Sequence, residues 1–336
     1  MRRHATVTSL SWIPSEAVEG MTKLGFESGF THYDAPPPDT VAGAEDVEAL
    51  RAHDRFRFAN RLDAWIEAED GRITAYGYGA ASGGVMGATT VQAGPARVTF
   101  QAFAMPEIRH EPEVGDGWVR FVQTTGGRTG LPAPRRVRRK PYVQFRAPLV
   151  WTTLALTLHA DGREEWEVVG ASPFPRHWIY GPDGKLAGKV GLADFRRWWR
   201  SAFGRHSPWG DEESPALVTA AETALERRLS TRIMQGAEAP MFRRLERGGV
   251  LVREGEEGDD LYLLLDGVLR VEAQGRRLAE IGPGALLGER AGLEGGRRTA
   301  TLTAVTPCRV AVVQAGLLDR AELEAVSRGH RREEPS

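Results

Sequence analysis

The sequence predicts a mainly β fold with a few helices: an N-terminal antiparallel β sandwich or barrel followed by a C-terminal jelly roll. Short runs that alternate apolar and polar residues recur along most of the chain, separated by Gly, Pro and Asp-Gly turns. The 336 residues leave room for two domains of about 100–200 residues each. We expect a β-rich domain over 1–200, a helical connector over 201–239, a jelly roll over 240–330 and a charged tail over 331–336.

Composition excludes several classes of protein. Forty-four Lys and Arg residues against forty-five Asp and Glu residues give a net charge of −1, so no global field attracts nucleic acid or anionic membrane. The single cysteine, Cys308, excludes internal disulfides and a multi-cysteine metal site. No apolar run reaches the roughly 18 residues of a membrane span, and no secretory segment follows Met1. We expect a cytoplasmic protein without a metal or cofactor.

Strands joined by tight turns dominate the first domain. Residues 6–12 alternate and stop before Pro14, three prolines at 36–38 form a stiff connection, and residues 45–53 suit one short helix. Asp-Gly pairs at 70–71 and 161–162 are hairpin signals. The remaining expected strands are 56–69, 73–78, 89–92, 97–104, 118–123, 149–159 and 164–169.

No catalytic signature accompanies the polar residues of the first domain. His32, Asp34, His159 and His177 stand outside any HExxH, GxSxG or P-loop pattern, so we expect structural or surface roles for them. The basic run at 135–140 lies between prolines and suits a solvated loop, with an anionic partner as the alternative.

Two helices are expected in the connector. Aromatic residues at helical spacing over 194–203 predict a packing face. Ser214 and Pro215 suit an N-cap and a first helical turn, which predicts a second helix to about Met234. That helix is either a transmitter of conformational change or a plain linker. The jelly roll is expected from short strands at 250–252, 261–265, 268–271, 278–281, 301–304 and 310–313.

The segment from Gly288 to Ala300 is suited to a phosphate ester. A glycine followed by a short helical turn leaves backbone N–H groups without partners inside the helix, and these favour an anion. Arg298 offers a planar cation that can bind phosphate oxygens through two parallel hydrogen bonds. The phosphate would repel Glu289, so this carboxylate is expected to accept a ribose hydroxyl instead. Phosphate and ribose together indicate a nucleotide.

This segment resembles the phosphate-binding cassette of the cyclic nucleotide-binding domain family, in which Gly-Glu precedes Arg-(Ala/Ser/Thr)-Ala. The matching residues are Gly288-Glu289 and Arg298-Thr299-Ala300, and the resemblance extends over about 240–328. It implies a site for cAMP or cGMP, in which threonine at the position of Thr299 touches the base edge. The implied site residues are Gly288, Glu289, Arg290, Ala291, Arg298, Thr299 and Ala300.

Two departures from the family pattern concern coupling and output. Arg290 and Gly292 stand where the family commonly has apolar side chains. The family uses those side chains to pass movement of the cassette to neighbouring helices, so we expect their replacement to affect this coupling more than nucleotide binding. After Val313 we expect one helix over 317–327, ended by a C-cap at Gly329 and able to cover the base. No winged helix follows, so DNA binding is not expected.

The resemblance implies a regulatory protein in which nucleotide bound to the jelly roll controls the N-terminal domain allosterically. Two alternatives stay open: an enzyme with its active site in the N-terminal barrel under nucleotide control, and a scaffold that binds a protein partner or a second copy. The sequence does not choose between cAMP and cGMP, or between sandwich and barrel.

Overall fold

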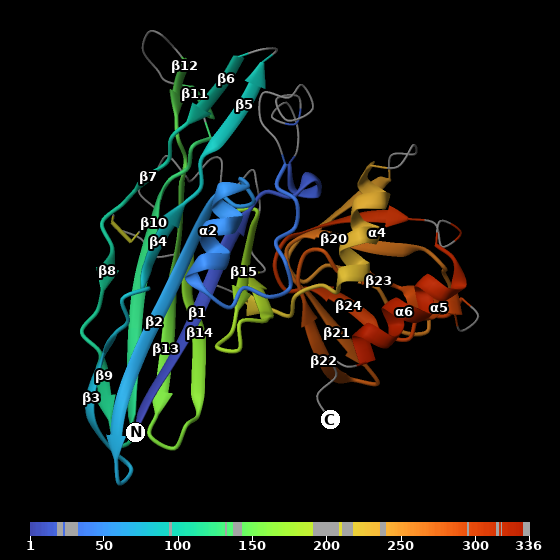
Figure 1. Cartoon of the computed structure of the whole chain (residues 1–336). Helices are drawn as coiled ribbons and strands as arrows, with labels where there is room; N and C mark the ends of the chain where they lie inside the picture. Colours follow the sequence, from blue (N-terminus) through green and yellow to red (C-terminus); the bar gives the residue numbers. More distant parts are fainter. Residues whose placement is uncertain are drawn as a thin grey trace. The chain divides into compact units, whose positions relative to one another are not determined.

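A computed structural model of the chain forms two compact units (Figure 1). It describes residues 1–18, 23, 33–93, 96–131, 133–136, 143–190, 208–209, 218–235, 240–293, 296–313, 316 and 318–331. The first unit comprises Met1–Pro14, Val18–Gly188 and Phe195–Ala216, and the second comprises Ser15–Ala17, Lys189–Asp194 and Leu217–Ser336. No helix in the described ranges is long and apolar enough to cross a membrane.

Two antiparallel sheets build the first unit. One has the order β16-β15-β1-β2-β3, with β4 also pairing with β2; the other has the order β14-β13-β10-β7, with β8 and β9 also pairing with β10. The strands of the first sheet are β1 (Arg2–Trp12), β2 (Phe58–Glu69), β3 (Arg72–Tyr78), β4 (Gly83–Met86), β15 (Arg176–Tyr180) and β16 (Leu186–Val190). Those of the second are β7 (Phe103–Ala104), β8 (Ile108–Arg109), β9 (Glu113–Gly115), β10 (Trp118–Arg128), β13 (Leu149–His159) and β14 (Glu164–Ala171).

The two sheets face each other as a sandwich. Between them the hydroxyls of Ser9 and Thr152 lie 2.8 Å apart, and Gln123 donates to the Asn60 side chain at 2.9 Å. Buried apolar residues from both sheets, including Phe58 and Val150, surround this polar network. Among the described residues neither sheet closes on itself, so the architecture is a sandwich and not a closed barrel.

Smaller elements complete the first unit. They are α2 (Ala44–Ala52) and the hairpins β5 (Thr89–Ala93) with β6 (Ala96–Phe100) and β11 (Ala133–Arg136) with β12 (Val143–Arg146). The short helix η1 (Ser15–Ala17) belongs to the second unit. The expected hairpin at 70–71 is confirmed, since Asp70 and Gly71 have φ of 47° and 76° between β2 and β3. Strands β4, β8, β9, β11, β12, β15 and β16 were not among the expected strands.

The second unit is a jelly roll of two four-stranded antiparallel sheets, with the orders β18-β25-β20-β23 and β19-β24-β21-β22. Its strands are β18 (Met241–Leu245), β19 (Val250–Val252), β20 (Leu261–Asp266), β21 (Leu269–Ala273), β22 (Arg276–Ile281), β23 (Leu286–Leu287), β24 (Thr301–Ala304) and β25 (Cys308–Val313). The central strand β20 is buried on both faces: Tyr262 and Leu264 pack between the sheets, whereas Leu261 and Leu263 pack against helices.

The connector helix α4 (Ala224–Gln235) begins nine residues later than expected. Ser214 lies outside the described residues, as does the helix expected over 194–203. Val218 and Thr219 form a strand, β17 (Val218–Thr219), paired with the end of β16. The helix is instead started by Thr223, whose hydroxyl accepts the Glu226 N–H at 3.2 Å while the Glu226 carboxylate accepts the Thr223 N–H at 2.8 Å.

The terminal helix α6 (Arg320–Arg331) continues through Gly329, so the expected C-cap at this glycine is wrong. Asp319 and Glu322 cap its start by exchanging side-chain to backbone hydrogen bonds of 2.8 and 3.0 Å. Glycine inside a helix costs about 1 kcal/mol relative to alanine. The partly buried side chain of His330, one residue further, holds the last turn against two other helices.

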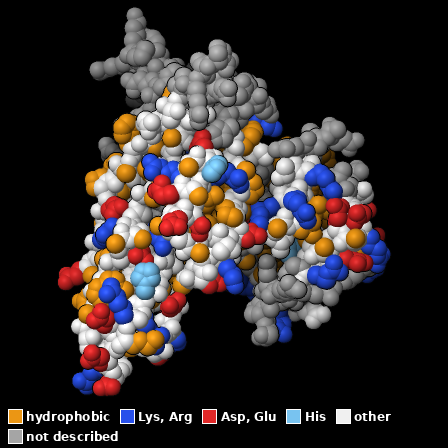
Figure 2. All heavy atoms as spheres, in the orientation of Figure 1, with side chains coloured by type: hydrophobic (Ala, Val, Ile, Leu, Met, Phe, Trp, Pro, Cys, Tyr) orange, Lys and Arg blue, Asp and Glu red, His pale blue; other side chains and the backbone are white. Residues whose placement is uncertain are grey.

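Charged side chains of both signs are interspersed on the face shown in Figure 2, in keeping with the net charge of −1. On that face no single sign dominates a large area.

Candidate functional site

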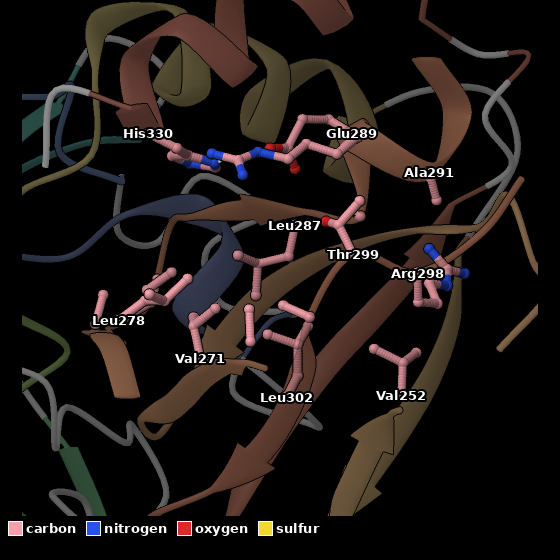
Figure 3. A pocket seen from close by; sticks show the side chains of 16 residues that line it. Val252, Val271, Leu278, Leu287, Glu289, Ala291, Arg298, Thr299, Leu302 and His330 are labelled. Atoms are coloured by element: carbon pink, nitrogen blue, oxygen red, sulfur yellow. The ribbon is translucent and has the colours of Figure 1, made fainter. Parts of the chain in front are cut away.

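The cassette residues surround a cavity of about 110 Å³ in the second unit, which has room for several water molecules (Figure 3). Strands of the β19 sheet, the end of β23, the short helix α5 (Glu289–Leu293) and α6 all contribute to its wall. The lining residues are Val252, Val271, Ala273, Leu278, Ala279, Ile281, Leu287, Gly288, Glu289, Arg290, Ala291, Arg298, Thr299, Ala300, Leu302 and His330. All seven residues expected at the site line this cavity.

Gly288 connects β23 to α5 in a conformation that only glycine adopts easily. Its φ is 92°, and a Cβ at this position would lie 2.8 Å from both the Asp260 carbonyl oxygen and the Arg298 Nη1. The glycine therefore permits a close approach between the cassette backbone and the arginine.

Arg298 is held in place before any ligand arrives. Only 5% of the residue is exposed. Its Nη1 donates to the Asp260 carbonyl at 2.8 Å and its Nη2 to the Tyr262 hydroxyl at 3.3 Å, with the guanidinium 5.2 Å from the Tyr262 ring. The Arg298 backbone N–H donates to Glu256 at 2.9 Å, which ties the end of the cassette to the loop after β19. These contacts fix the orientation of the Arg298 guanidinium.

Glu289, the first residue of α5, is buried and contacts a cation. Its carboxylate lies 3.1 Å from His330 Nδ1, and the other ring nitrogen of His330 lies 3.1 Å from the Glu226 carboxylate. Burial alone would lower the pKa of His330, but the hydrogen bonds to Glu226 and Glu289 and their charges raise it to about 10. Figure 3 shows His330 and Glu289 pointing toward one another.

Glu226 is the second carboxylate of this cluster. Burial opposes its ionisation, but the hydrogen bond and charge of His330, with the N–H groups of Thr223 and Leu286, lower its pKa to about 2. Sequence reasoning missed both His330 and Glu226. The one signal for His330 was its spacing: Leu323, Val326 and His330 share one face of a helix.

The cavity combines a polar end with an apolar wall. Thr299 lies between Glu289 and Arg298 in Figure 3, and Ala291 is fully buried beside Arg298. On the other side, strands β21, β22 and β24 present only hydrocarbon; the side chains are Val271, Ala273, Leu278, Ala279, Ile281 and Leu302. This arrangement suits a ligand with one anionic part and one flat apolar part.

Comparison with known proteins agrees with this geometry. Residues 242–321 match the family model of the cyclic nucleotide-binding domain. This region is a cyclic nucleotide-binding domain. The match supports a cyclic nucleotide-binding regulatory role for the chain.

Curated relatives of the cyclic nucleotide-binding domain are much longer proteins. The potassium/sodium hyperpolarization-activated cyclic nucleotide-gated channel 3 of Homo sapiens is 33% identical over 105 residues, covering 31% of this chain and 12% of the channel. The cGMP-dependent protein kinase, isozyme 2, of Drosophila melanogaster is 34% identical over 65 residues, covering 19% of this chain and 6% of the kinase. The chain thus spans about an eighth or less of these relatives.

Solved structures match over the same share of the chain. A cyclic nucleotide-binding domain from Methylobacillus flagellatus is 28% identical with a TM-score of 0.21, covering 27% of this chain and 52% of that one. A structure described as PKAR CBD2 bound to Sp-2Cl-cAMPS is 22% identical with a TM-score of 0.25, covering 32% and 84%.

Outside the cyclic nucleotide-binding domain, the polar residues singled out in the first unit have structural partners. His32 lies outside the described residues. Asp34 is buried against Arg57 and accepts the Ile13 N–H at 2.7 Å. His177 is fully buried, with its ring nitrogens 2.7 Å from the Ser11 hydroxyl and 2.7 Å from the Ser172 carbonyl.

Burial lowers the pKa of His177 to about 4, so the ring is neutral and donates to one partner while it accepts from the other. His159 forms an ion pair of 3.3 Å with the exposed Glu165. Both ring nitrogens of His177 are hydrogen-bonded, so this histidine has no free nitrogen for acid–base chemistry. Burial also raises the pKa of Cys308 to about 11, and the described residues contain no cluster of three or more metal-ligating side chains.

Proposed function

We propose that the cyclic nucleotide-binding domain of this chain binds cAMP or cGMP, and that occupancy regulates the first unit. The observation that carries the proposal is the convergence of Glu289, Arg298 and Thr299 on one cavity (Figure 3). A buried arginine at one end and a buried carboxylate at the other match the phosphate and the ribose of one small molecule.

The phosphate would bind to Arg298. Its guanidinium contacts are a backbone carbonyl and a phenol hydroxyl, and neither partner neutralises its charge. A cyclic phosphate entering the cavity supplies the missing negative charge, and the hydroxyl of Thr299 and the amides after Gly288 complete its hydrogen bonds. Arg290 and Ala291 line the cavity on the same helix.

Ribose and base would occupy the rest of the cavity. Glu289 accepts a hydrogen bond from a ribose hydroxyl. The hydroxyl is neutral, so it does not repel the carboxylate as the phosphate would. A purine ring packs against the apolar wall of β21, β22 and β24, where it removes hydrocarbon from water. Ala300 lies where the cassette returns to this wall.

The output would travel through α4, because Glu226 on this helix contacts the cassette. Its carboxylate accepts the Leu286 N–H at 3.1 Å and also contacts His330. Residue 189, directly after the main segment of the first unit, is buried in the second unit, where Lys189 pairs with Glu222 at 2.5 Å. Nucleotide that prefers one arrangement of these contacts biases the chain that leads into the first unit.

Titration calorimetry of the full chain with cAMP and with cGMP tests this function. Arg298→Ala should weaken binding by about 2–3 kcal/mol, roughly 30- to 150-fold, because a charge-assisted contact is lost. Arg297→Ala is the matched control. The side chain of Arg297 is exposed, and its removal changes the net charge by the same amount as Arg298→Ala. Absence of binding by the unaltered protein would reject the proposal.

Regulation of the first unit needs a separate measurement. Hydrogen exchange of the sandwich strands, with and without saturating nucleotide, reports whether occupancy reaches them. We expect a changed exchange rate in β16, which contains Lys189, and in β15, the strand before it. Exchange that changes only in residues 218–331 would show two independent modules.

A further inference from the structure

The side chain of His330 contacts Glu289, the residue that would accept the ribose hydroxyl in the proposed function. His330 lines the cavity, and its Nδ1 lies 3.1 Å from the Glu289 carboxylate. Its Nε2 lies 3.1 Å from Glu226 on α4. One imidazole therefore joins α6, α5 and α4, and we call this arrangement the His330 bridge.

The bridge requires a charged imidazole. Both ring nitrogens face carboxylate oxygens, and only the imidazolium form donates from both. Glu226 and Glu289 are 2% and 4% exposed, so each is a buried charge that gains from the imidazolium beside it. Taking His330 away removes the cation that both buried carboxylates share.

We propose that His330 is an internal competitor for the nucleotide: in the unliganded protein it holds the cassette glutamate, and nucleotide gains the ribose contact only when the bridge opens. This inference rests on the proposed function, because it concerns the same site. It goes further by assigning a role to a residue outside the cassette.

Helix α6 has other anchors that remain when the bridge opens. Arg232 on α4 makes two hydrogen bonds of 2.8 and 2.9 Å to Glu322 at the start of α6. Leu229 and Ile233 of α4 pack with Leu323 and Val326 of α6 in one core cluster. The last turn of α6 can therefore move while its first two turns stay docked.

The charges around His330 set a pH dependence for nucleotide binding. Glu226 faces it from α4 and Glu289 from α5, and two further charged side chains, Arg290 and Arg298, line the cavity. In the bridge the pKa of His330 is about 10, and once released it returns toward its ordinary value of 6.5. Between these values opening releases a proton, so the bridge weakens and nucleotide affinity rises as pH rises.

The test measures cAMP affinity by calorimetry at pH 7 and pH 9. For the unaltered chain we expect affinity to rise at least about tenfold between the two pH values. His330→Asn should bind at least about tenfold more tightly at pH 7 and lose most of the pH dependence. His330→Lys keeps a cation that does not titrate in this range, so it should bind weakly at both pH values.

Arg232→Gln is the control, because it loosens α6 at the far end from the cavity and should leave the pH dependence intact. Weaker binding by His330→Asn at pH 7, or an unchanged pH dependence, would overturn the competition. The same titrations with cGMP detect binding if the site prefers guanine to adenine.

Failure of the proposed function is separable from failure of the bridge. If neither the unaltered chain nor His330→Asn binds either nucleotide, the proposed function is rejected. Hydrogen exchange of unliganded protein then decides the bridge alone: His330→Asn should speed exchange in residues 289–293 and in the last turn of α6. Unchanged exchange there would overturn the bridge.

Discussion

The carboxylate of Glu226 accepts the backbone N–H of Leu286 at 3.1 Å, two residues before Gly288 opens the cassette. The same carboxylate caps the start of α4 through Thr223. A single side chain thus joins the first turn of α4 to the strand that leads into the cavity. Any shift of the cassette backbone changes a contact that α4 needs for its own start.

The left-handed turn at Gly288 should not tolerate a side chain. Gly288→Ala places a methyl group 2.8 Å from Arg298 and from the Asp260 carbonyl, at a φ that costs about 1–2 kcal/mol for alanine. We expect lower stability in urea unfolding and loss of nucleotide binding. Gly275→Ala shares the positive φ, 73°, but has open space around it, so only the backbone cost should appear.

Tyr262 should contribute to affinity by holding Arg298. Tyr262→Phe removes the hydroxyl that lies 3.3 Å from the guanidinium while the ring stays in the core. The expected loss is about 0.5–1.5 kcal/mol, a few-fold to about tenfold in the dissociation constant. Tyr78→Phe removes a hydroxyl that donates to two carbonyls in the first unit, and calorimetry should show unchanged affinity for it.

Removing only Lys189 from its buried pair with Glu222 should destabilise the protein more than removing both charges. Lys189 also donates to the Pro283 carbonyl, and both side chains are almost fully buried. Lys189→Met should cost about 3–5 kcal/mol in the unfolding free energy, because Glu222 stays behind as a lone buried charge. Adding Glu222→Gln should recover part of that loss, and equal stability of the single and double variants would contradict this account.

The second unit should be most stable between about pH 4.5 and 6.5 and should lose stability at lower and at higher pH. The depressed pKa of Glu226, about 2, contributes stability that is present above about 4.5 and is lost as pH falls toward 2. The raised pKa of His330, about 10, contributes stability that is complete below 6.5 and is lost as pH rises toward 10. Melting temperatures across pH 3–10 check this, and His330→Asn should flatten the alkaline side.

Local patterns predicted much of the fold. The Asp70-Gly71 turn, helix 45–53 and all six expected jelly-roll runs correspond to described elements, because alternation and turn chemistry act over a few neighbouring residues. The start of α4 was placed wrongly for a related reason. Val218 and Thr219 pair with β16, a strand about 30 residues earlier in the chain, and no local pattern around Ser214 records that pairing.

The cassette could be found from the sequence because its parts are close together in the chain. Gly288, Glu289 and Arg298 lie within eleven consecutive positions, and their chemistry follows from the residue types. The apolar wall opposite was predicted only as strands. Which of their faces meets the cassette depends on how the two sheets of the jelly roll pack.

The sequence by itself determined the jelly roll, the cassette and the β-rich character of the first domain, since each depends on short-range periodicity or contiguous residues. Only the tertiary structure decided that the first unit is a sandwich, that Gly329 lies within a helix and that His330 faces Glu289 and Glu226. His330 and Glu226 are separated by 104 positions. The free energy that brings them together comes from burying α4 and α6 against the jelly roll, and no local pattern records that packing.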